Sequence, residues 1–349
     1  MGLTVSVIIV SYNGWRLLPR TLDALERQSR QADEIVVVDN GSSDGTLANL
    51  RDHYPAVICL DAEANLGFAA GNNLGVARSS GEVLVLLNND AVPEADFLAE
   101  LVQPIEVDPT LGSTAATMVF SRDQSIVASA GIEVYRNGLA LDRGLGWSIC
   151  DLGRPAPVFG TSAGAAAYRR MAWEDAGGFA EPFWMYLEDV DLAWRLRLRG
   201  WETLQVPRAI AVHDYSASAV EGSALKRRLL ARNRNWTIVR CWPAPLLARH
   251  AGSILAYDLM AAGYGAVARD WAVIGGRLEA IRSLGLRQRE RAAIQRGAAV
   301  EPERLERWLL PSPPPGEVLR LRRLTGRLAS QSHLVSRRPS QSHNPRDEC

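Results

Sequence analysis

The chain has 349 residues, of which 47% are hydrophobic, which is enough for one large α/β domain with an appendage or for two modest domains. Its 39 Lys and Arg residues balance its 39 Asp and Glu residues, so no overall charge favours nucleic acid and we expect no nucleic-acid partner. The charge is unevenly distributed, because the stretch from Ser216 onward has 23 basic and 11 acidic residues. This asymmetry indicates either an anionic partner, such as a membrane surface, or a solvated Arg-rich helical face.

Neither a signal peptide nor a membrane span is predicted. A strand-like run begins at Val5 without a basic segment before it or a small-residue cleavage site after it. The most membrane-like stretch, from Leu246 to Ala268, is interrupted by Arg249, His250 and Asp258, so about 20 uninterrupted apolar residues are not present. We therefore expect a cytoplasmic protein, with the inner face of the plasma membrane as its site of any peripheral attachment.

Apolar runs alternate with amphipathic segments over the first 90 residues. Strands are predicted at Val5–Val10, Ile35–Val38, Val57–Leu60 and Val83–Leu87. Continuous apolar strands separated by helices are typical of a parallel sheet that is covered on both faces. The polar residues that follow these strands are therefore expected at one edge, where ligands bind in open α/β sheets. The chain has no G-x-G-x-x-G after the first strand and no P-loop motif, so the sequence supports neither a dinucleotide-binding fingerprint nor a P-loop.

The remaining sequence predicts three further parts. Residues 113–170 contain strand-like runs such as Ala115–Phe120 and Ile126–Tyr135, which indicate an added mixed sheet. A helix near Asp189 and a strand pair around Thr203–Val212 complete the first domain, over residues 1–215. Residues 216–285 read as a basic amphipathic helical extension, and residues 286–349 as a flexible tail rich in Pro, Ser and Arg.

The first two strands end in residues that suit a nucleotide. The first strand ends in the run Val10-Ser11-Tyr12-Asn13, and the second ends at Asp39, followed by a Gly/Ser turn. A carboxylate at this strand tip can accept the N3–H of uracil or thymine, while the turn offers backbone N–H groups to an anion. Taken alone, the turn motif is more often a plain turn with a helix cap; its pairing with the first run favours a ligand site.

A small-residue loop follows the third strand. It includes Gly67, Asn72 and Asn73, and it leads into a helix. Small residues let a base or ribose approach the backbone, and either Asn could bond to it. Tight packing of a helix on the sheet explains the glycines equally well.

The fourth strand ends in Asn88-Asn89-Asp90, and a later run carries three acids. A hard divalent cation that holds a diphosphate needs oxygen ligands at a strand tip, and Asp90 is placed to give one. The later run, Glu188-Asp189-Val190-Asp191, precedes a helical pattern; alone, such acids would merely favour a helix start. Trp184 and Tyr186, just before it, suit either sugar stacking or core packing.

Together these motifs resemble those of inverting family 2 glycosyltransferases with the GT-A fold, a mostly parallel Rossmann-like sheet, and most closely the bacterial rhamnosyltransferase-like branch. The resemblance spans roughly residues 3–215 and also includes Asn65-Leu66-Gly67-Phe68, Gly178-Phe179 and His213. In that family the fourth strand usually ends in Asp-x-Asp, whereas here the first acid is replaced by Asn88. The resemblance therefore implies that Asp90 and His213 bind the metal, Mg²⁺ or Mn²⁺. It implies that Asn88 either offers the metal a neutral carbonyl or contacts the ribose instead.

The resemblance also implies the other site residues and the reaction. Asp189 is the base that takes the proton of the acceptor hydroxyl, with Glu188 beside it. Its pKa is pulled down by the helix N-terminus and up by the neighbouring acids and the donor diphosphate. The implied donor-binding residues are Val10, Ser11, Tyr12, Asp39, Gly67, Asn72, Asn73, Asn88 and Asn89, and the implied acceptor-binding residues are Trp184, Tyr186 and Asp191.

The sequence thus predicts transfer of a sugar from a nucleotide-diphosphate donor to a glycan or lipid-linked acceptor in cell-wall or surface-polysaccharide synthesis. Both UDP-sugars and dTDP-rhamnose stay open as donors, because uracil and thymine present the same N3–H edge to Asp39; the branch favours dTDP-rhamnose. One alternative is a non-catalytic nucleotide-sugar-binding or membrane scaffold protein, which the loss of an acid at Asn88 favours. Another is a sugar-phosphate nucleotidyltransferase, but its Gly-rich, basic loop after the first strand is missing here.

Overall fold

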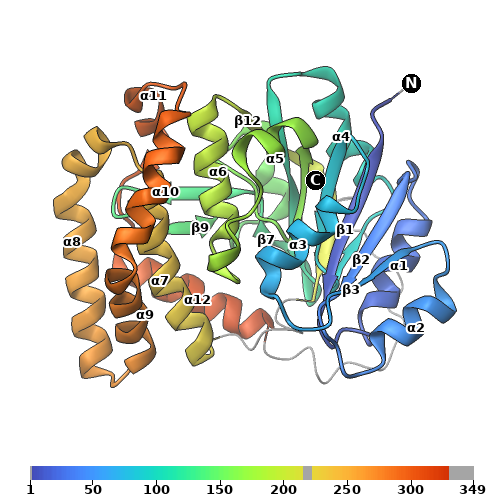
Figure 1. Ribbon diagram of the computed structural model, residues 1–349, viewed down its shortest axis with the longest axis horizontal. Coiled ribbons are helices and arrows are strands. Elements are labelled where there is room, and N and C mark those ends of the chain that lie inside the picture. Colours follow the sequence, from blue (N-terminus) through green and yellow to red (C-terminus); the bar gives the residue numbers. More distant parts are fainter. Residues whose placement is uncertain (1, 215–221, 330–349) are drawn as a thin grey trace.

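The computed structural model describes residues 2–214 and 222–329, and a large mixed sheet runs through the N-terminal two thirds of the chain (Figure 1). The spatial order of its main strands is β10-β12-β6-β11-β4-β1-β2-β3, with β5 paired to β12 and β7 paired to β6. The bounds are β1 (Val5–Ser11), β2 (Glu34–Asp39), β3 (Ile58–Asp61), β4 (Val83–Leu87), β5 (Ala91–Pro93), β6 (Leu111–Phe120), β7 (Asp123–Ser129), β10 (Ala156–Pro157), β11 (Ala165–Arg169) and β12 (Glu202–His213).

Strands β1 to β4 form the parallel half of the sheet, as the sequence predicts. Their side chains alternate between two cores. On one face, Val7 packs with Leu22 of α1 and Leu101 of α4, and on the other face Ile8 packs with Val76 of α3. The helices that cover the sheet are α1 (Leu18–Glu26), α2 (Thr46–His53), α3 (Gly67–Ala77), α4 (Phe97–Val107), α5 (Arg170–Ala176) and α6 (Glu188–Arg199).

The added part of the sheet is mixed, as expected, but two predicted strand patterns are wrong in detail. The run Ile126–Tyr135 is broken into β7 and β8 (Ile132–Tyr135) because Gly131, with φ +107°, turns the chain between them. The predicted strand pair around Thr203–Val212 is one long strand, β12, whose pairing with β6 shifts register between Gln205 and Ile210. This single strand runs the length of the sheet along the strand direction and ends on the side where β4 ends.

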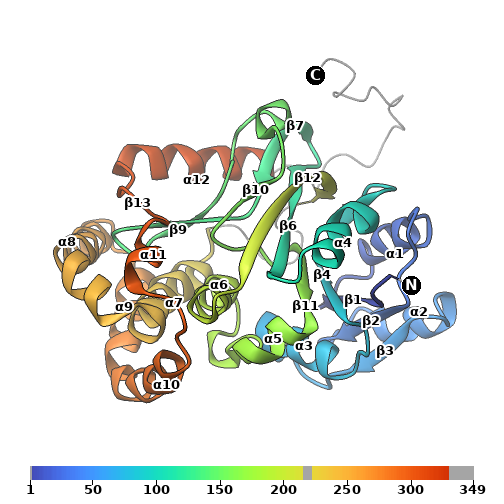
Figure 2. The ribbon, with the colours of Figure 1, turned by 90° about the horizontal axis from the view of Figure 1, so that it is seen from above.

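The C-terminal part is a group of helices beside α6, with α8 outermost (Figures 1 and 2). Its elements are α7 (Ala224–Cys241), α8 (Ala244–Val267), α9 (Trp271–Arg282), α10 (Leu284–Arg296), α11 (Pro302–Glu306), β13 (Leu309–Leu310) and α12 (Pro315–Ala329). Strand β13 joins β8 and β9 (Ala140–Asp142) in a second, three-stranded sheet. Among the described residues, no helix is both long and apolar enough to cross a membrane.

The sequence predicts a flexible tail from residue 286 onward, and this prediction is wrong for residues 286–329. Leu305 and Leu309 pack into a core with Trp194 of α6 and Trp242, which follows α7. Two leucines in an otherwise polar stretch thus have a large apolar partner surface, which composition alone does not reveal. The remainder of the predicted tail, residues 330–349, lies outside the described residues.

Candidate active site

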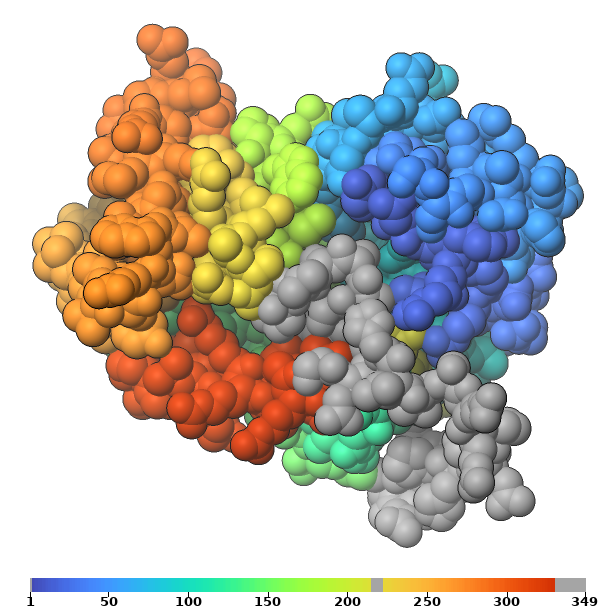
Figure 3. All heavy atoms as spheres, turned by 90° about the horizontal axis from the view of Figure 1, so that it is seen from below, coloured from blue at the N-terminus to red at the C-terminus, as the bar shows by residue number. Residues whose placement is uncertain are grey.

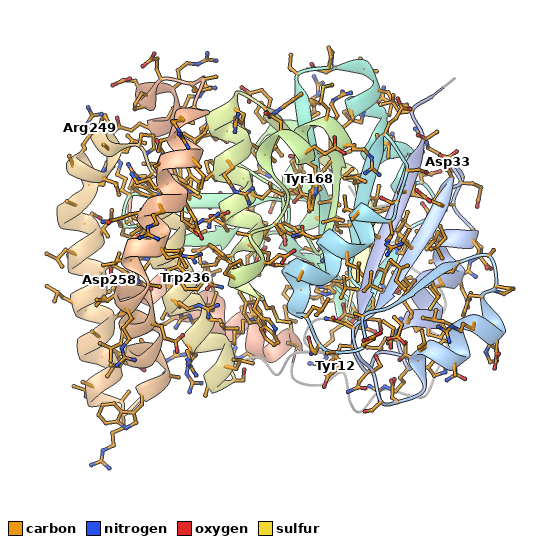
Figure 4. All side chains as sticks on the ribbon, viewed as in Figure 1. Tyr12, Asp33, Tyr168, Trp236, Arg249 and Asp258 are labelled. Carbon is orange, nitrogen blue, oxygen red and sulfur yellow. The ribbon has the colours of Figure 1, made fainter. Side chains whose placement is uncertain are left out.

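The carboxyl ends of the parallel strands lie at the lower edge of the sheet in Figure 4, where Tyr12 follows β1. Asp33, which precedes β2, lies at the opposite edge. Tyr12 is 41% exposed, so its ring stands open at this edge. Because β6 and β12 run parallel to one another, and β6 and β4 both run antiparallel to β11, Asn88 and His213 also fall at this edge.

Asp39 ends β2 and is almost fully buried. One carboxylate oxygen accepts from the N–H of Ser42 at 3.3 Å, while the other, Oδ1, has no hydrogen-bond partner among the described residues. A buried carboxylate oxygen without a donor is costly, and an N–H of a ligand is a partner that would satisfy it. The position predicted from the sequence therefore fits the binding of a ligand N–H group at this strand tip.

Asn40 is a structural residue of this edge to which the sequence analysis gave no role. Its side chain accepts from the N–H of Leu66 at 2.9 Å and donates to the carbonyl of Gly67 at 3.2 Å. It therefore fixes the loop before α3 against the end of β2. An amide side chain directly after a strand-terminal Asp is the sequence signal that points to such a role.

The turn after β1 is tied to its neighbours by side-chain bonds. Asn13 donates its N–H to Ser42 Oγ and accepts from the N–H of Ser43, both at 2.8 Å. Ser11 Oγ accepts from the amide of Asn89 at 3.1 Å, and both residues are buried. Val10 packs against Gly71 of α3. The predicted donor-binding residues Val10, Ser11 and Asn89 thus lie together, with contacts to the protein itself.

Helix α3 supplies Gly67, Asn72 and Asn73. Gly67 has φ +82°, and any side chain there would collide with Trp184, so glycine is required both by conformation and by space. Asn72 is buried and donates to the carbonyl of Phe68 in its own helix. Asn73 donates to the carbonyl of Phe179 at 2.9 Å and accepts from its N–H at 3.0 Å. In this structure the amide of Asn73 therefore holds the loop before α6.

Asp90 and His213 are 123 residues apart in sequence and meet through the antiparallel pairing of β5 with β12. The register places His213 opposite Ala91, and His213 Nε2 lies 3.0 Å from Asp90 Oδ1. Burial lowers the pKa of His213, but the nearby Asp90 carboxylate outweighs it and raises this pKa above its usual value. The amide nitrogen of Asn88 lies 3.3 Å from the same imidazole nitrogen.

These three side chains could take part in holding a divalent cation. Two neighbouring ligands of an octahedral ion, each about 2.1 Å from it, are about 3.0 Å apart, and the Asp90–His213 separation matches this spacing. Within residues 2–214 and 222–329, however, no group of three or more His, Cys, Asp or Glu side chains is placed to hold a metal. The pair therefore fits an ion that takes further ligands from a bound diphosphate, in keeping with the loss of one acid at Asn88.

Asp189 and Glu188 begin α6 at the same edge. Asp189 Oδ2 accepts from the N–H of Ala163 at 3.3 Å, and the next residue, Gly164, accepts from the N–H of Asn88 at 2.9 Å. One short segment therefore connects the first turn of α6 to the end of β4. Burial raises the pKa of Asp189 to about 6, against the opposing bonds from Ala163 and Val190, and burial also raises the pKa of Glu188 well above its usual value.

Asp191 does not have the place that its predicted acceptor-binding role requires. It is fully buried, and its two oxygens pair with Arg195 Nε and Arg240 Nε, each at 2.8 Å. Burial alone would raise the pKa of Asp191, but the two guanidinium groups hold it below its usual value. The second of these arginines, Arg240, comes from α7. The acidic motif alone does not predict that α7 contacts α6.

Trp184 and Tyr186 are partly buried in the segment before α6. The Trp184 indole packs on Gly67, and its carbonyl accepts from the N–H of Ala69 at 3.1 Å. The Lys226 ammonium lies 5.2 Å from the centre of the Tyr186 ring. Trp184 thus packs against the small-residue loop of α3 and joins two parts of the candidate site.

Comparison with solved structures shows that this architecture is the GT-A fold. A structure of GalNAc-T7 with UDP, GalNAc and Mn²⁺ matches 72% of this chain and 51% of its own chain, with a TM-score of 0.59 and 21% identity. A mannosyltransferase from Pyrobaculum calidifontis, in complex with GDP-Man and Mn²⁺, matches 95% of this chain and 88% of its own, with a TM-score of 0.53 and 20% identity. At such identity these likenesses establish the fold.

Sequence comparison gives the family. Residues 6–176 match the model for glycosyl transferase family 2. The N-acetylglucosaminyl-diphospho-decaprenol L-rhamnosyltransferase of Mycobacterium tuberculosis is 27% identical over 71% of this chain and 89% of its own length. The O-antigen chain rhamnosyltransferase RfbN of Salmonella typhimurium is 26% identical over 61% of this chain and 67% of its own. The chain belongs to glycosyl transferase family 2, in its rhamnosyltransferase-like branch, and is a glycosyltransferase.

Proposed function

We propose that this glycosyltransferase moves a sugar from a nucleoside-diphosphate donor to a hydroxyl of a lipid-linked or glycan acceptor in cell-wall or surface-polysaccharide synthesis, with inversion at the anomeric carbon. The observation that supports it best is the gathering of Asp39, the Asp90–His213 pair and Asp189 at one edge of the sheet. The rhamnosyltransferase names of the relatives favour dTDP-rhamnose as the donor, and a UDP-sugar is the other candidate.

The roles follow from the surroundings of each side chain. Asp39 Oδ1 accepts the N3–H of the pyrimidine base, for which it has no competing partner among the described residues. Asp90 and His213, with the side-chain amide of Asn88 nearby, would hold Mg²⁺ or Mn²⁺, which neutralises charge on the departing diphosphate when bound.

Asp189 is the base of the transfer. The acceptor oxygen forms a bond to the anomeric carbon while the bond from that carbon to the diphosphate breaks, and the hydroxyl proton passes to Asp189. The nucleoside diphosphate leaves with the bonding electrons. A carboxylate with a pKa raised to about 6 is a stronger base than an ordinary aspartate and is still ionised at neutral pH.

A donor panel tests this proposal. Purified protein is given dTDP-rhamnose or UDP-sugars with a polyprenyl-diphospho-N-acetylglucosamine acceptor, with and without Mn²⁺ or Mg²⁺. We expect metal-dependent release of the nucleoside diphosphate and a glycosylated acceptor. Binding of donors without any turnover would instead favour the non-catalytic scaffold.

We also propose that the C-terminal helices contact an anionic membrane surface. Large apolar side chains are exposed along α8 and the start of α9: Leu255, Leu259, Met260, Tyr264, Val267 and Trp271. Figure 4 shows that α8 runs downward from Arg249 past Asp258, so its end lies on the same side of the molecule as Tyr12. This apolar strip, in a part of the chain whose sequence has an excess of basic residues, suits the plane of a bilayer that carries a lipid-linked acceptor.

A further inference from the structure

The segment from Trp184 to Leu187 has an unfavourable backbone. Trp184, Tyr186 and Leu187 have φ values of +65°, +70° and +63°, a region that bulky residues rarely adopt. Three of the six non-glycine residues with positive φ in the described part of the chain fall here. Such a conformation persists only where the surrounding structure imposes it. The segment directly precedes Glu188 and Asp189, so its geometry sets where α6 begins.

Asn233 of α7 contacts this segment directly. Its side chain is fully buried, and its amide nitrogen lies 3.1, 3.0 and 2.7 Å from the carbonyl oxygens of Phe183, Met185 and Tyr186. An amide nitrogen has two hydrogens, so one hydrogen is shared between two of these oxygens. Three converging carbonyl oxygens repel one another unless a donor lies between them.

Arg232 fixes the orientation of that amide. Its Nε donates to Asn233 Oδ1 at 2.8 Å. This bond holds the amide oxygen on the Arg232 side, so the amide nitrogen is the atom that faces the segment. Arg232 Nη2 also donates to the carbonyls of Pro182 and Phe183, at 3.2 and 2.9 Å. The guanidinium in turn lies over the Trp236 ring, 4.2 Å from its centre. The two adjacent residues therefore form one rigid support.

The supported segment touches both halves of the candidate active site. On one side Trp184 packs on Gly67 and bonds to Ala69 at the start of α3. On the other side it leads into Asp189, whose carboxylate is anchored to Ala163. The pyrimidine-recognition residue, Asp39, lies in the sheet itself, at the end of β2. A shift of the segment would therefore move the carboxylates of α6 while leaving the end of β2 in place.

We propose that Asn233, oriented by Arg232, is a positioning residue for transfer: it holds the Trp184–Leu187 segment so that Asp189 faces the acceptor. This inference rests on the function proposed above. It places a residue outside the N-terminal 215 positions in the working of the site, so the predicted boundary at residue 215 does not separate catalysis from the C-terminal helices. A residue that merely fills the core would change stability but not the rate per folded site.

The test compares Asn233→Ala with Asn235→Ala, a matched change two positions along the same helix. The Asn235 amide donates to the carbonyl of Ala231 in its own helix and does not reach the segment. Folded sites are counted by titration with dTDP and UDP in Mn²⁺, and release of nucleoside diphosphate is measured with the donor panel. For Asn233→Ala we expect a loss of about thirtyfold or more in kcat per binding site with nucleotide Kd nearly unchanged. For Asn235→Ala we expect both within about twofold of the unmodified chain.

A second variant keeps the inference testable if Asn233→Ala does not fold. Arg232→Met removes the orienting bond and the two bonds to Pro182 and Phe183, just before the segment, at a partly exposed position, so we expect about a fivefold or greater loss in kcat per site. Unchanged kcat per site in either folded variant overturns the inference alone. Failure of the unmodified chain to bind either nucleotide, or to turn over any donor, overturns the proposed function and the inference with it.

Discussion

Three acids within four positions of α6 have different surroundings, and these surroundings separate their roles. Asp191 is ionised between two arginines, whereas Glu188 is buried and one of its oxygens has no partner among the described residues. Asp189 is partly buried and has its pKa raised to about 6. Only Asp189 therefore combines access to the sheet edge with a basicity that suits proton abstraction at neutral pH.

Replacing Asp189 with Asn should separate donor binding from transfer. We expect Asp189→Asn to lower kcat by about a hundredfold to ten-thousandfold, because it removes the proton acceptor, and to leave nucleotide Kd close to that of the unmodified chain. Asp191→Asn is the matched control, since it breaks the two arginine pairs. We expect this variant to have a lower unfolding temperature but little change in the rate per folded site. Near-normal turnover in Asp189→Asn would contradict the base assignment.

The same substitution should change how stability depends on pH. The pKa of Asp189 in the folded chain, about 6, lies above the value of about 3.9 for an aspartate in an unfolded chain, so the folded chain holds this proton more tightly than the unfolded chain. Stability from the neutral acid is present below about pH 4 and is lost as the pH rises through about 6. Because the side chain is only partly buried, the difference between these pKa values sets an upper limit of about 3 kcal/mol on this pH-dependent part of the stability.

Asn carries no charge at any pH, so Asp189→Asn should raise the free energy of unfolding at pH 7.5 and leave it unchanged at pH 4. Urea unfolding at the two pH values measures this difference. A gain of equal size at both pH values would mean that the effect does not come from ionisation.

At the scale of elements, the site depends on pairings between distant segments. Strand β5 is only three residues long, yet its antiparallel pairing with β12 brings His213 to Asp90. The start of α3 likewise meets the segment before α6 at Gly67, where the indole of Trp184 occupies the space of a side chain. Contacts of this kind, which involve only a few residues, determine which side chains meet at the site, although they bury little of the hydrophobic core.

Gly67→Ala should destabilise the chain by about 1–3 kcal/mol, because alanine disfavours φ +82° and its methyl group would displace Trp184. Gly263→Ala in α8 is the matched control. Apart from its chain neighbours and the backbone of its own helix, no atom lies within 4 Å of a methyl group there, and the position is inside a helix, so we expect a gain of about 0.5–1 kcal/mol. Chemical denaturation of both variants measures the contrast. A gain in stability for Gly67→Ala would rule out the packing described here.

Local pattern was enough to predict the parallel half of the sheet and the strand tips that carry Asp39 and Asp90. The four predicted strands differ from β1 to β4 by one residue at some ends, since apolar runs with clear polar stops leave little choice. Asp191 and Asn233 could not be assigned in this way. Their roles depend on α7 lying against α6 and the segment before it, a long-range contact that spacing along the chain does not encode. The order in residues 286–329 was missed for the same reason.

On the scale of the whole molecule, the acidic N-terminal part and the basic C-terminal helices lie at opposite ends (Figure 3, blue and orange). The face seen in Figure 3 is the side on which the strands end and on which the turn between α8 and α9 lies. An active site and an exposed apolar strip on one side suit an acceptor whose reactive sugar is held close to a bilayer. Removal of the C-terminal helices cannot test this, because α7 also supports the segment before Asp189.

A single charge at the end of α8 provides a cleaner test. Val267 is 88% exposed at the last position of α8, and we expect Val267→Asp to reduce co-flotation with anionic vesicles about tenfold or more, because a carboxylate replaces an apolar contact and is repelled by the lipid charge. Val107 is 70% exposed at the last position of α4, so Val107→Asp makes the same change far from the proposed surface and should float like the unmodified chain. Activity on a short water-soluble acceptor should be the same in both variants, since neither residue belongs to the candidate site. Equal flotation of the two variants would refute the membrane contact while leaving the transfer reaction untouched.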